Sequence, residues 1–139
     1  MTAILVDSNV LLDIMTEDSH WLAWSAAAIE QAAHSFRLVI NPVIYAEVSV
    51  RYSRIEALDA ALPKAMSDRE AIPYEAGFLA GRRFLTYRRR GGMKRSPLPD
   101  FFIGAHAAVA GYRLLTRDAT RYRSYFPKLS LIAPNGAGM

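Results

Sequence analysis

Short apolar segments that alternate with longer helical patterns constrain the fold of this chain most. Four runs have the length and flanks of buried parallel strands, at residues 4–6, 38–40, 114–115 and 129–132, with a weaker fifth candidate at 70–72 before Pro73. Helical patterns occupy 21–33, the segment opened by Asn41-Pro42, 55–62, 74–89 and 99–111. The alternation predicts an α/β fold with a mainly parallel sheet.

The length and composition predict one domain. The chain has 139 residues and no cysteine, which excludes disulfides and thiolate metal sites. We expect the domain to cover residues 1–133, with a disordered tail at 134–139 and a mobile loop at 91–98. No apolar run approaches the roughly 20 residues of a membrane span, and the first residues lack the order of a secretion signal. We therefore expect a soluble cytoplasmic protein.

Two aspartates follow predicted strands directly. Asp7 ends the first strand, and Asp118 comes just after the strand at 114–115. Sites in open parallel sheets form at the carboxyl ends of the strands. If these two strands are neighbours, their backbones lie about 4.8 Å apart, and both carboxylates face the same crevice.

Two further acids are expected at this edge. Glu47 lies on the first or second turn of the helix that begins at Asn41-Pro42, and Asp100 lies on the first turn of the helix that begins at Pro99. Each acid alone also has a structural explanation, such as a helix cap, a turn or a favourable helix dipole. The convergence of all four at one edge is much less expected by chance, provided that the assumed topology is right.

Four clustered carboxylates repel one another by a few kcal/mol per pair at about 4 Å. Either some of them take up protons, or they bind a hard cation. Oxygen ligands without cysteine or an obvious histidine favour Mg²⁺ or Mn²⁺ over zinc. Such a cation would polarise a phosphodiester and activate a water for in-line attack.

Basic residues gather in one segment. The chain carries 17 Lys and Arg against 13 Asp and Glu, a net charge of +4. Seven cations and no acid lie between residues 82 and 95, including Arg88, Arg89, Arg90, Lys94 and Arg95. This cluster suits a polyanion such as RNA, while a solvated helix face that runs into a loop explains it equally well.

The sequence resembles the PIN-domain nucleases, and among them the VapC-type toxins of toxin–antitoxin pairs. The matching segments are ILVDSNVLLD, NPVIYAEV, PLPDFFIGAHA and RLLTRDATRY, in that order between residues 4 and 122. The resemblance implies a five-stranded parallel sheet of order 3-2-1-4-5 with helices on both faces. It also implies an endoribonuclease that depends on Mg²⁺ or Mn²⁺.

Carried over by position, the resemblance assigns catalysis and metal binding to four acids, Asp7, Glu47, Asp100 and Asp118. Asn9 and Thr116 match the small polar residues beside these acids, and they and Ser8 could orient the carboxylates through hydrogen bonds. A cognate antitoxin is implied as partner, and an antitoxin arginine that reaches the acids is one way to inhibit them. A homodimer is a further expectation, and apolar residues near Trp21, Trp24 and Phe78 could serve either interface or the core.

Two other functions compete with the nuclease hypothesis. A phosphotransfer or phosphatase domain would need a second acid where Asn9 stands and a lysine near the acids, for which only Lys128 is available. The other alternative is a non-catalytic RNA- or protein-binding module on the same fold. The presence of all four acids argues against it.

Several remaining residues receive structural interpretations. We expect Asp13 and Glu17 to be surface acids of a helix, and His106 to point away from Asp100, because six residues turn a helix by a net 120°. Three tyrosines, Tyr87, Tyr122 and Tyr125, could stack on RNA bases, although core or rim positions are the stronger expectation.

Overall fold

A parallel sheet of five strands forms the centre of the structure, a computed structural model that describes residues 3–66, 68–92 and 98–134. The strands are β1 (Ala3–Val6), β2 (Arg37–Ile40), β3 (Asp68–Arg69), β4 (Arg113–Leu115) and β5 (Leu131–Ile132). Their order is β3-β2-β1-β4-β5, and every neighbouring pair is parallel. The predicted fold class is therefore confirmed, including the pairing of β1 with β4 on which the site prediction depends.

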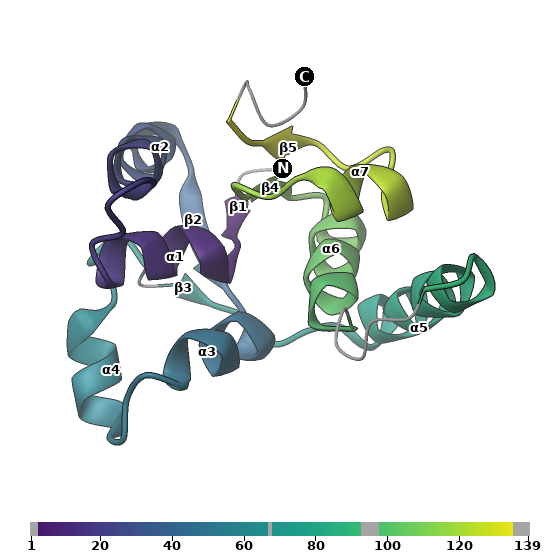
Figure 1. Cartoon of the computed structure of the whole chain (residues 1–139), viewed down its shortest axis with the longest axis horizontal. Coiled ribbons are helices and arrows are strands. Elements are labelled where there is room, and N and C mark those ends of the chain that lie inside the picture. Colours follow the sequence, from purple (N-terminus) through teal and green to yellow (C-terminus); the bar gives the residue numbers. More distant parts are fainter. Residues whose placement is uncertain (1–2, 67, 93–97, 135–139) are drawn as a thin grey trace.

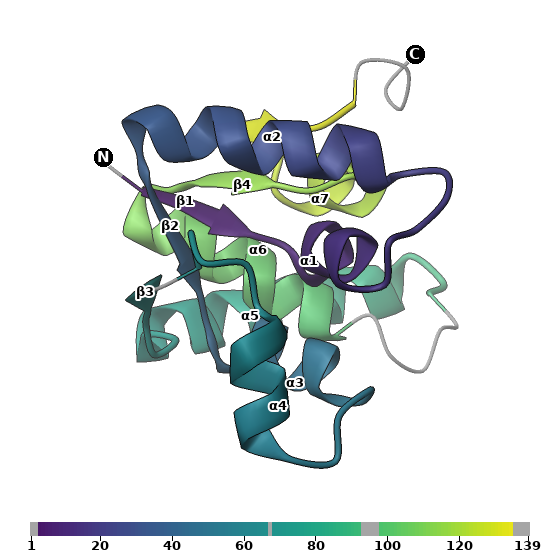
Figure 2. The same ribbon diagram turned by 90° about the vertical axis from the view of Figure 1, so that its left-hand side faces the viewer.

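Helices cover both faces of the sheet. They are α1 (Ser8–Met15), α2 (Leu22–Ser35), α3 (Pro42–Ser49), α4 (Ile55–Ala61), α5 (Tyr74–Arg89), α6 (Leu98–Ala110) and α7 (Thr120–Tyr125). Figure 1 shows α1 and α2 on one side of the strands and α5, α6 and α7 on the other. In Figure 2, seen from the side, α2 lies over the sheet and α3 and α4 lie beyond the end of β2.

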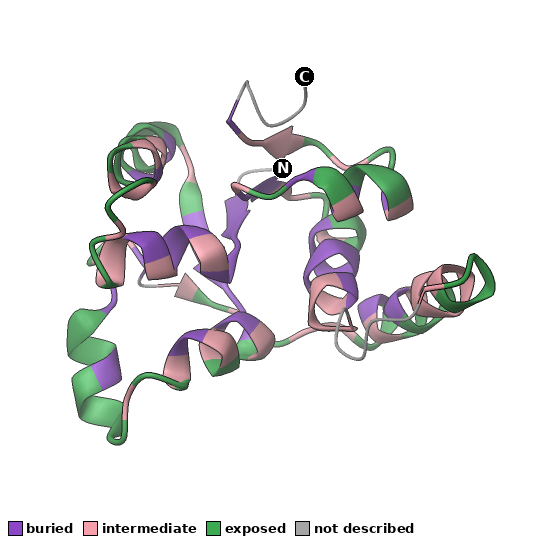
Figure 3. Cartoon of the chain, viewed as in Figure 1, coloured by how far each residue is buried: buried purple, intermediate pink, exposed green. Residues whose placement is uncertain are grey.

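The core lies on both sides of β1. All four residues of this strand are fully buried, because β1 is central and each of its faces is covered. Phe101 and Ile103 of α6 are equally buried. Figure 3 shows the buried residues concentrated on β1, on the inward side of α1 and along α6. This pattern explains why the first strand is a continuous apolar run rather than an alternating one.

Local sequence signals set two helix ends. The Asn41 side chain accepts a hydrogen bond from Ile44 N at 2.9 Å, and Pro42 occupies the first helical position of α3. Gly111 follows α6 with φ of 75°, the left-handed conformation that ends many helices and that glycine adopts without strain. Both features agree with the sequence prediction.

The structure differs from the prediction at β3 and α7. The strand predicted at residues 70–72 is found at Asp68–Arg69, where Arg37 Nη1 of β2 pairs with Asp68 at 3.0 Å. Because β3 is an edge strand with one neighbour, a charged cross-strand pair replaces the apolar content that the prediction used. Helix α7 was not predicted, since its six residues TRYRSY carry no clear apolar period.

Some predictions fall outside the described residues. Lys94 and Arg95, most of the predicted mobile loop and residues 135–139 of the predicted tail belong to this group. Pro134, the first residue of that predicted tail, is buried. Within the described part of the chain, no helix has both the length and the apolar character needed to cross a membrane.

Candidate active site

The carboxyl ends of β1 and β4 bring their acids to one edge of the sheet. Asp7 N donates to Leu115 O at 2.9 Å, so the parallel pairing of the two strands continues to Asp7 itself. Asp118 follows two residues after Thr116 at the end of β4. Helix α3 leaves the same edge after β2 and carries Glu47, and α6 begins there with Asp100 in its first turn.

Asp7 is the most enclosed of the four acids, with only 3% of its surface exposed. Its Oδ1 accepts the backbone N–H of Ser8 at 2.7 Å. Its Oδ2 accepts the Thr116 hydroxyl at 2.9 Å and the Tyr122 hydroxyl at 3.0 Å. These three donors fix the orientation of the carboxylate at the carboxyl end of β1.

Glu47 and Asp100 lie half-buried beside Asp7. The Ser8 hydroxyl donates to Glu47 Oε1 at 2.7 Å, so Ser8 connects α1 to α3. Asp100 Oδ2 accepts from Arg121 Nη1 at 2.6 Å. Asp118 is exposed, and its backbone N–H donates to the Thr116 hydroxyl at 3.1 Å. The edge therefore has three enclosed acids and a fourth at its rim.

Burial and mutual repulsion raise the pKa of the enclosed acids. Loss of solvation, followed by the charge of Asp100, raises the pKa of Asp7 to about 7. The pKa of Glu47 is also raised, first by burial and then by Asp100. Burial raises the pKa of Asp100, with a further contribution from Asp118, while Arg121 opposes the shift. The charge of Asp100 thus acts on both Asp7 and Glu47, and that of Asp118 acts on Asp100.

The predicted polar residues Asn9 and Thr116 form a small network at the end of β4. Thr116 Oγ1 donates to Asp7 and accepts from Asn9 Nδ2 at 3.3 Å. Asn9 Oδ1 accepts from the backbone N–H of Arg117 at 3.3 Å. Together with Ser8, these side chains hold Asp7, Glu47 and the Asp118 loop relative to one another.

Two residues of α7 complete the site and were missed as site residues. Tyr122 is 2% exposed and donates to Asp7, which corrects the alternative that it stacks on RNA bases. Its pKa is raised well above 10 by burial and then by the charges of Asp7 and Asp100, so it stays protonated and remains a donor. Arg121 contacts Asp100. The motif TRDATRY holds both residues, and their spacing after Asp118 was the available signal.

Asp13 corrects the prediction of a surface acid. It is 2% exposed and accepts from Arg117 Nε at 2.8 Å, from Arg117 Nη2 at 3.0 Å and from the Ser25 hydroxyl at 2.7 Å. A cation from the loop after β4 therefore makes burial of this carboxylate tolerable. Glu17, the other predicted surface acid, is exposed. His106 is buried beside Asn41, away from Asp100, as predicted.

The donor set at this edge fits a hard divalent cation in its chemistry. All four acids offer carboxylate oxygens, which Mg²⁺ and Mn²⁺ prefer. Among the described residues, however, no three acidic, cysteine or histidine side chains lie close enough together to hold a metal ion as they stand. Thr116 and Tyr122 donate to Asp7, Ser8 donates to Glu47, and Arg121 donates to Asp100. A cation would have to compete with some of these donors.

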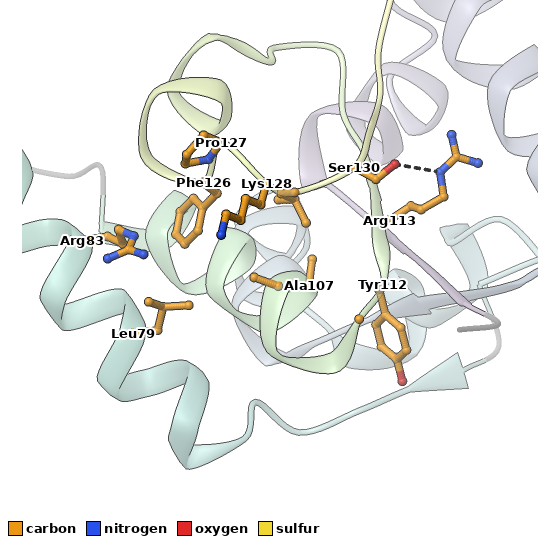
Figure 4. A pocket seen from close by; sticks show the side chains of 12 residues that line it. Leu79, Arg83, Ala107, Tyr112, Arg113, Phe126, Pro127, Lys128 and Ser130 are labelled. Atoms are coloured by element: carbon orange, nitrogen blue, oxygen red, sulfur yellow. Dashed lines mark hydrogen bonds between the residues drawn. The ribbon is translucent and has the colours of Figure 1, made fainter.

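A cavity of about 620 Å³ lies elsewhere, between α5, α6 and the segment before β5. Figure 4 shows Lys128 and Arg83 at this cavity, with Arg113 donating to Ser130. Because Arg113 begins β4, the cavity belongs to the amino end of that strand. Lys128, the lysine that a phosphotransfer domain would require near the acids, therefore lies at the other edge of the sheet.

The basic end of α5 lies on the same side as the acids. Arg88, Arg89 and Arg90 are exposed, and none of them pairs with an acid in the described part of the chain. Tyr87, in the same turn, packs against Phe101, which follows Asp100 directly. The arginines that the sequence singled out are thus next to the acidic edge.

Comparison with solved structures identifies similar folds. VapBC2 from Rickettsia felis, bound to a promoter DNA fragment, matches with TM-score 0.72 and 15% identity over 96% of this chain and 100% of that one. VapBC-1 from nontypeable Haemophilus influenzae matches with a TM-score of 0.70 and 15% identity, over 95% of this chain and 98% of that one. A toxin–antitoxin complex from Klebsiella pneumoniae matches with a TM-score of 0.64 and 20% identity, over 93% of this chain and 95% of that one.

Comparison with curated protein sequences gives no match. The model of the PIN domain, by contrast, matches residues 4–126, which include all four acids and most of the chain. Strand order, acid placement and this match agree, and the chain belongs to the PIN domain family.

Proposed function

We propose that this protein is a cytoplasmic endoribonuclease that depends on Mg²⁺ or Mn²⁺ and acts as the toxin of a toxin–antitoxin pair. The observation that carries the proposal is the convergence of Asp7, Glu47 and Asp100 at one edge of the sheet, where burial raises all three pKa values and the charge of Asp100 adds to the shifts of the other two. Membership of the PIN family, whose members are generally nucleases, supports it.

The four acids, Asp7, Glu47, Asp100 and Asp118, would hold the cation. When bound, it would supply a Lewis acid for the phosphodiester and lower the pKa of an attacking water. Tyr122 and Thr116 fix the orientation of Asp7 through its Oδ2. Ser8 donates to Oε1 of Glu47 and fixes the orientation in which this carboxylate would hold the cation.

RNA would reach the acids along the basic end of α5. The Arg90 guanidinium lies 5.1 Å from the centre of the Tyr125 ring, and that of Arg88 lies 5.9 Å from the centre of Phe84. Guanidinium groups held on aromatic rings remain free to contact phosphates. We therefore assign phosphate contacts to Arg88, Arg89 and Arg90, and extend the proposal to Lys94 and Arg95 from their charge alone.

A protein antitoxin is the proposed partner, because the similar structure from Klebsiella pneumoniae is named a toxin–antitoxin complex. A homodimer is proposed as well. Tyr74 and Phe78 on α5 are 97% and 74% exposed, and they supply apolar surface for one of these contacts. Trp21 and Trp24 are half-buried against each other and belong partly to the fold.

The test is cleavage of a single-stranded RNA by the purified protein. We expect cleavage with Mg²⁺ or Mn²⁺, none in EDTA, and a loss of at least a hundredfold in Asp100→Asn. Glu56→Gln, a change of an exposed acid on α4, should cleave at the wild-type rate. Cleavage that persists in EDTA or in Asp100→Asn would refute the proposal. Tight RNA binding without any cleavage would instead favour the non-catalytic binding module.

A further inference from the structure

Arg121 makes the shortest ion pair among the described residues, and it makes it with an acid of the site. Its Nη1 lies 2.6 Å from Asp100 Oδ2, and both side chains are 33% exposed. Within the described part of the chain, no other cation pairs with any of the four acids. Arg117, four residues before Arg121, pairs with Asp13 instead.

The position of Arg121 gives its guanidinium a second contact. The guanidinium carbon lies 5.8 Å from the centre of the Tyr87 ring, which directly precedes Arg88 at the end of α5. Arg121 thus stands between the acids on one side and the proposed RNA path on the other. One long side chain with four rotatable bonds can turn between these two neighbours without movement of α7.

Simultaneous contact of a guanidinium and a divalent cation with Asp100 is unfavourable, because like charges within a few ångströms repel strongly at a half-buried site. If a cation binds the Asp100 oxygen that accepts the charge-assisted hydrogen bond, either the arginine leaves that oxygen or the oxygen holds the cation more weakly. The ion pair therefore offsets part of the charge that Asp100 exerts on Asp7 and Glu47, and it predicts a competition between the guanidinium and a cation for Asp100.

We propose that Arg121 is an internal counter-ion of Asp100 that a divalent cation displaces, after which its guanidinium contacts the phosphate of the bound RNA. The inference rests on the proposed function, since it assumes that the acids bind a cation. Arg121 is a positioning residue in this scheme. It offsets the charge of Asp100 before a cation binds and moves its own charge to the substrate when the cation arrives.

The experiment measures Mn²⁺ binding directly, by calorimetry or by the spin resonance of free Mn²⁺, without substrate. Arg121→Met keeps an unbranched, flexible stem and removes the guanidinium charge, so it should bind Mn²⁺ about tenfold more tightly than wild type. Arg121→Lys keeps a cation and should stay close to wild type. Arg123→Met, a change of an exposed arginine on the same helix, is the matched control and should not alter the affinity.

Cleavage at saturating Mn²⁺ tests the second half of the inference. Arg121→Met should cleave RNA at least tenfold more slowly than wild type despite its tighter Mn²⁺ binding, a combination that a purely structural role does not produce. Thermal unfolding verifies that each variant is folded, and Arg121→Gln replaces Arg121→Met if the latter is not.

The outcomes separate the two proposals. If wild type binds Mn²⁺ and Asp100→Asn does not, but Arg121→Met binds it no more tightly than wild type, the counter-ion role is overturned and the nuclease proposal stands. An unchanged cleavage rate in Arg121→Met would overturn the phosphate contact. If neither wild type nor any variant binds Mn²⁺ at these acids, the proposed function itself fails.

Discussion

The Asp7 carboxyl is subject to two opposing effects, because it is both the most buried acid of the site and the one with the most donors. Burial and the charge of Asp100 raise its pKa, while Thr116, Tyr122 and the Ser8 N–H lower it, with a net value of about 7. In the unfolded chain the value returns to about 3.8. Between these two values the folded protein holds a proton that the unfolded chain has lost, so stability falls as the pH rises through this window.

Replacement of Asp7 by Asn should remove this pH dependence. In EDTA, the free energy of unfolding of wild type relative to Asp7→Asn should fall by about 2–3 kcal/mol between pH 5 and pH 8, at 1.36 kcal/mol per pKa unit. The loss of one acceptor in Asn shifts the whole curve by a constant and leaves the slope unaffected. Urea unfolding across this range measures the difference. Parallel curves for the two proteins would contradict the raised pKa.

Helix α1 and the loop after β4 act as one unit at the scale of elements. Asp13 of α1 holds Arg117 through two nitrogens, and Asn9 of α1 accepts from the Arg117 backbone. The Arg117 guanidinium also lies 5.4 Å from the centre of the Trp21 ring. Because Arg117 lies between Thr116 and Asp118, these contacts set the position of two polar groups of the site from a distance.

A double-mutant cycle tests this connection between elements. Arg117→Ala leaves the buried Asp13 carboxylate without its cation and should destabilise the fold by about 3–5 kcal/mol. The further change Asp13→Asn should recover part of that loss, with a coupling energy of about 1–3 kcal/mol. Denaturant unfolding of wild type, both single variants and the double variant gives the value. Additive effects would mean that the pair does not hold the loop.

The sequence predicted most elements because their signals were local. Asn41-Pro42 and Gly111 marked helix ends by their own backbone preferences, and β1 was recognisable as a short apolar run. Asp13 could not be predicted to be buried, since its cation lies 104 residues further along the chain. Tyr122 and Arg121 were missed in the same way, because only the fold brings α7 against Asp7 and Asp100. The edge strand β3 depends on its pairing with Arg37 rather than on its own composition.

Charge is unevenly distributed over the whole molecule, although the net value is only +4. Buried and half-buried acids occupy the carboxyl edge of the sheet, and the adjoining end of α5 carries arginines that pair with no acid among the residues that the structure describes. A polyanion is repelled by the first group and attracted by the second. Binding of RNA should therefore be driven by the arginines, while the acids contribute to affinity only when a cation neutralises them.

Salt dependence of RNA binding tests this division of charge. In the proposed mode, Arg88→Ala/Arg89→Ala removes two phosphate contacts, and the slope of log affinity against log salt should decrease in magnitude by about 1.4, at about 0.7 per contact with a single strand. Arg54→Ala/Lys64→Ala removes the same charge from exposed positions that flank α4 and should leave the slope near wild type. Fluorescence anisotropy with a labelled, non-cleavable oligonucleotide measures both. Equal changes in the two double variants would show that net charge, rather than the end of α5, controls binding.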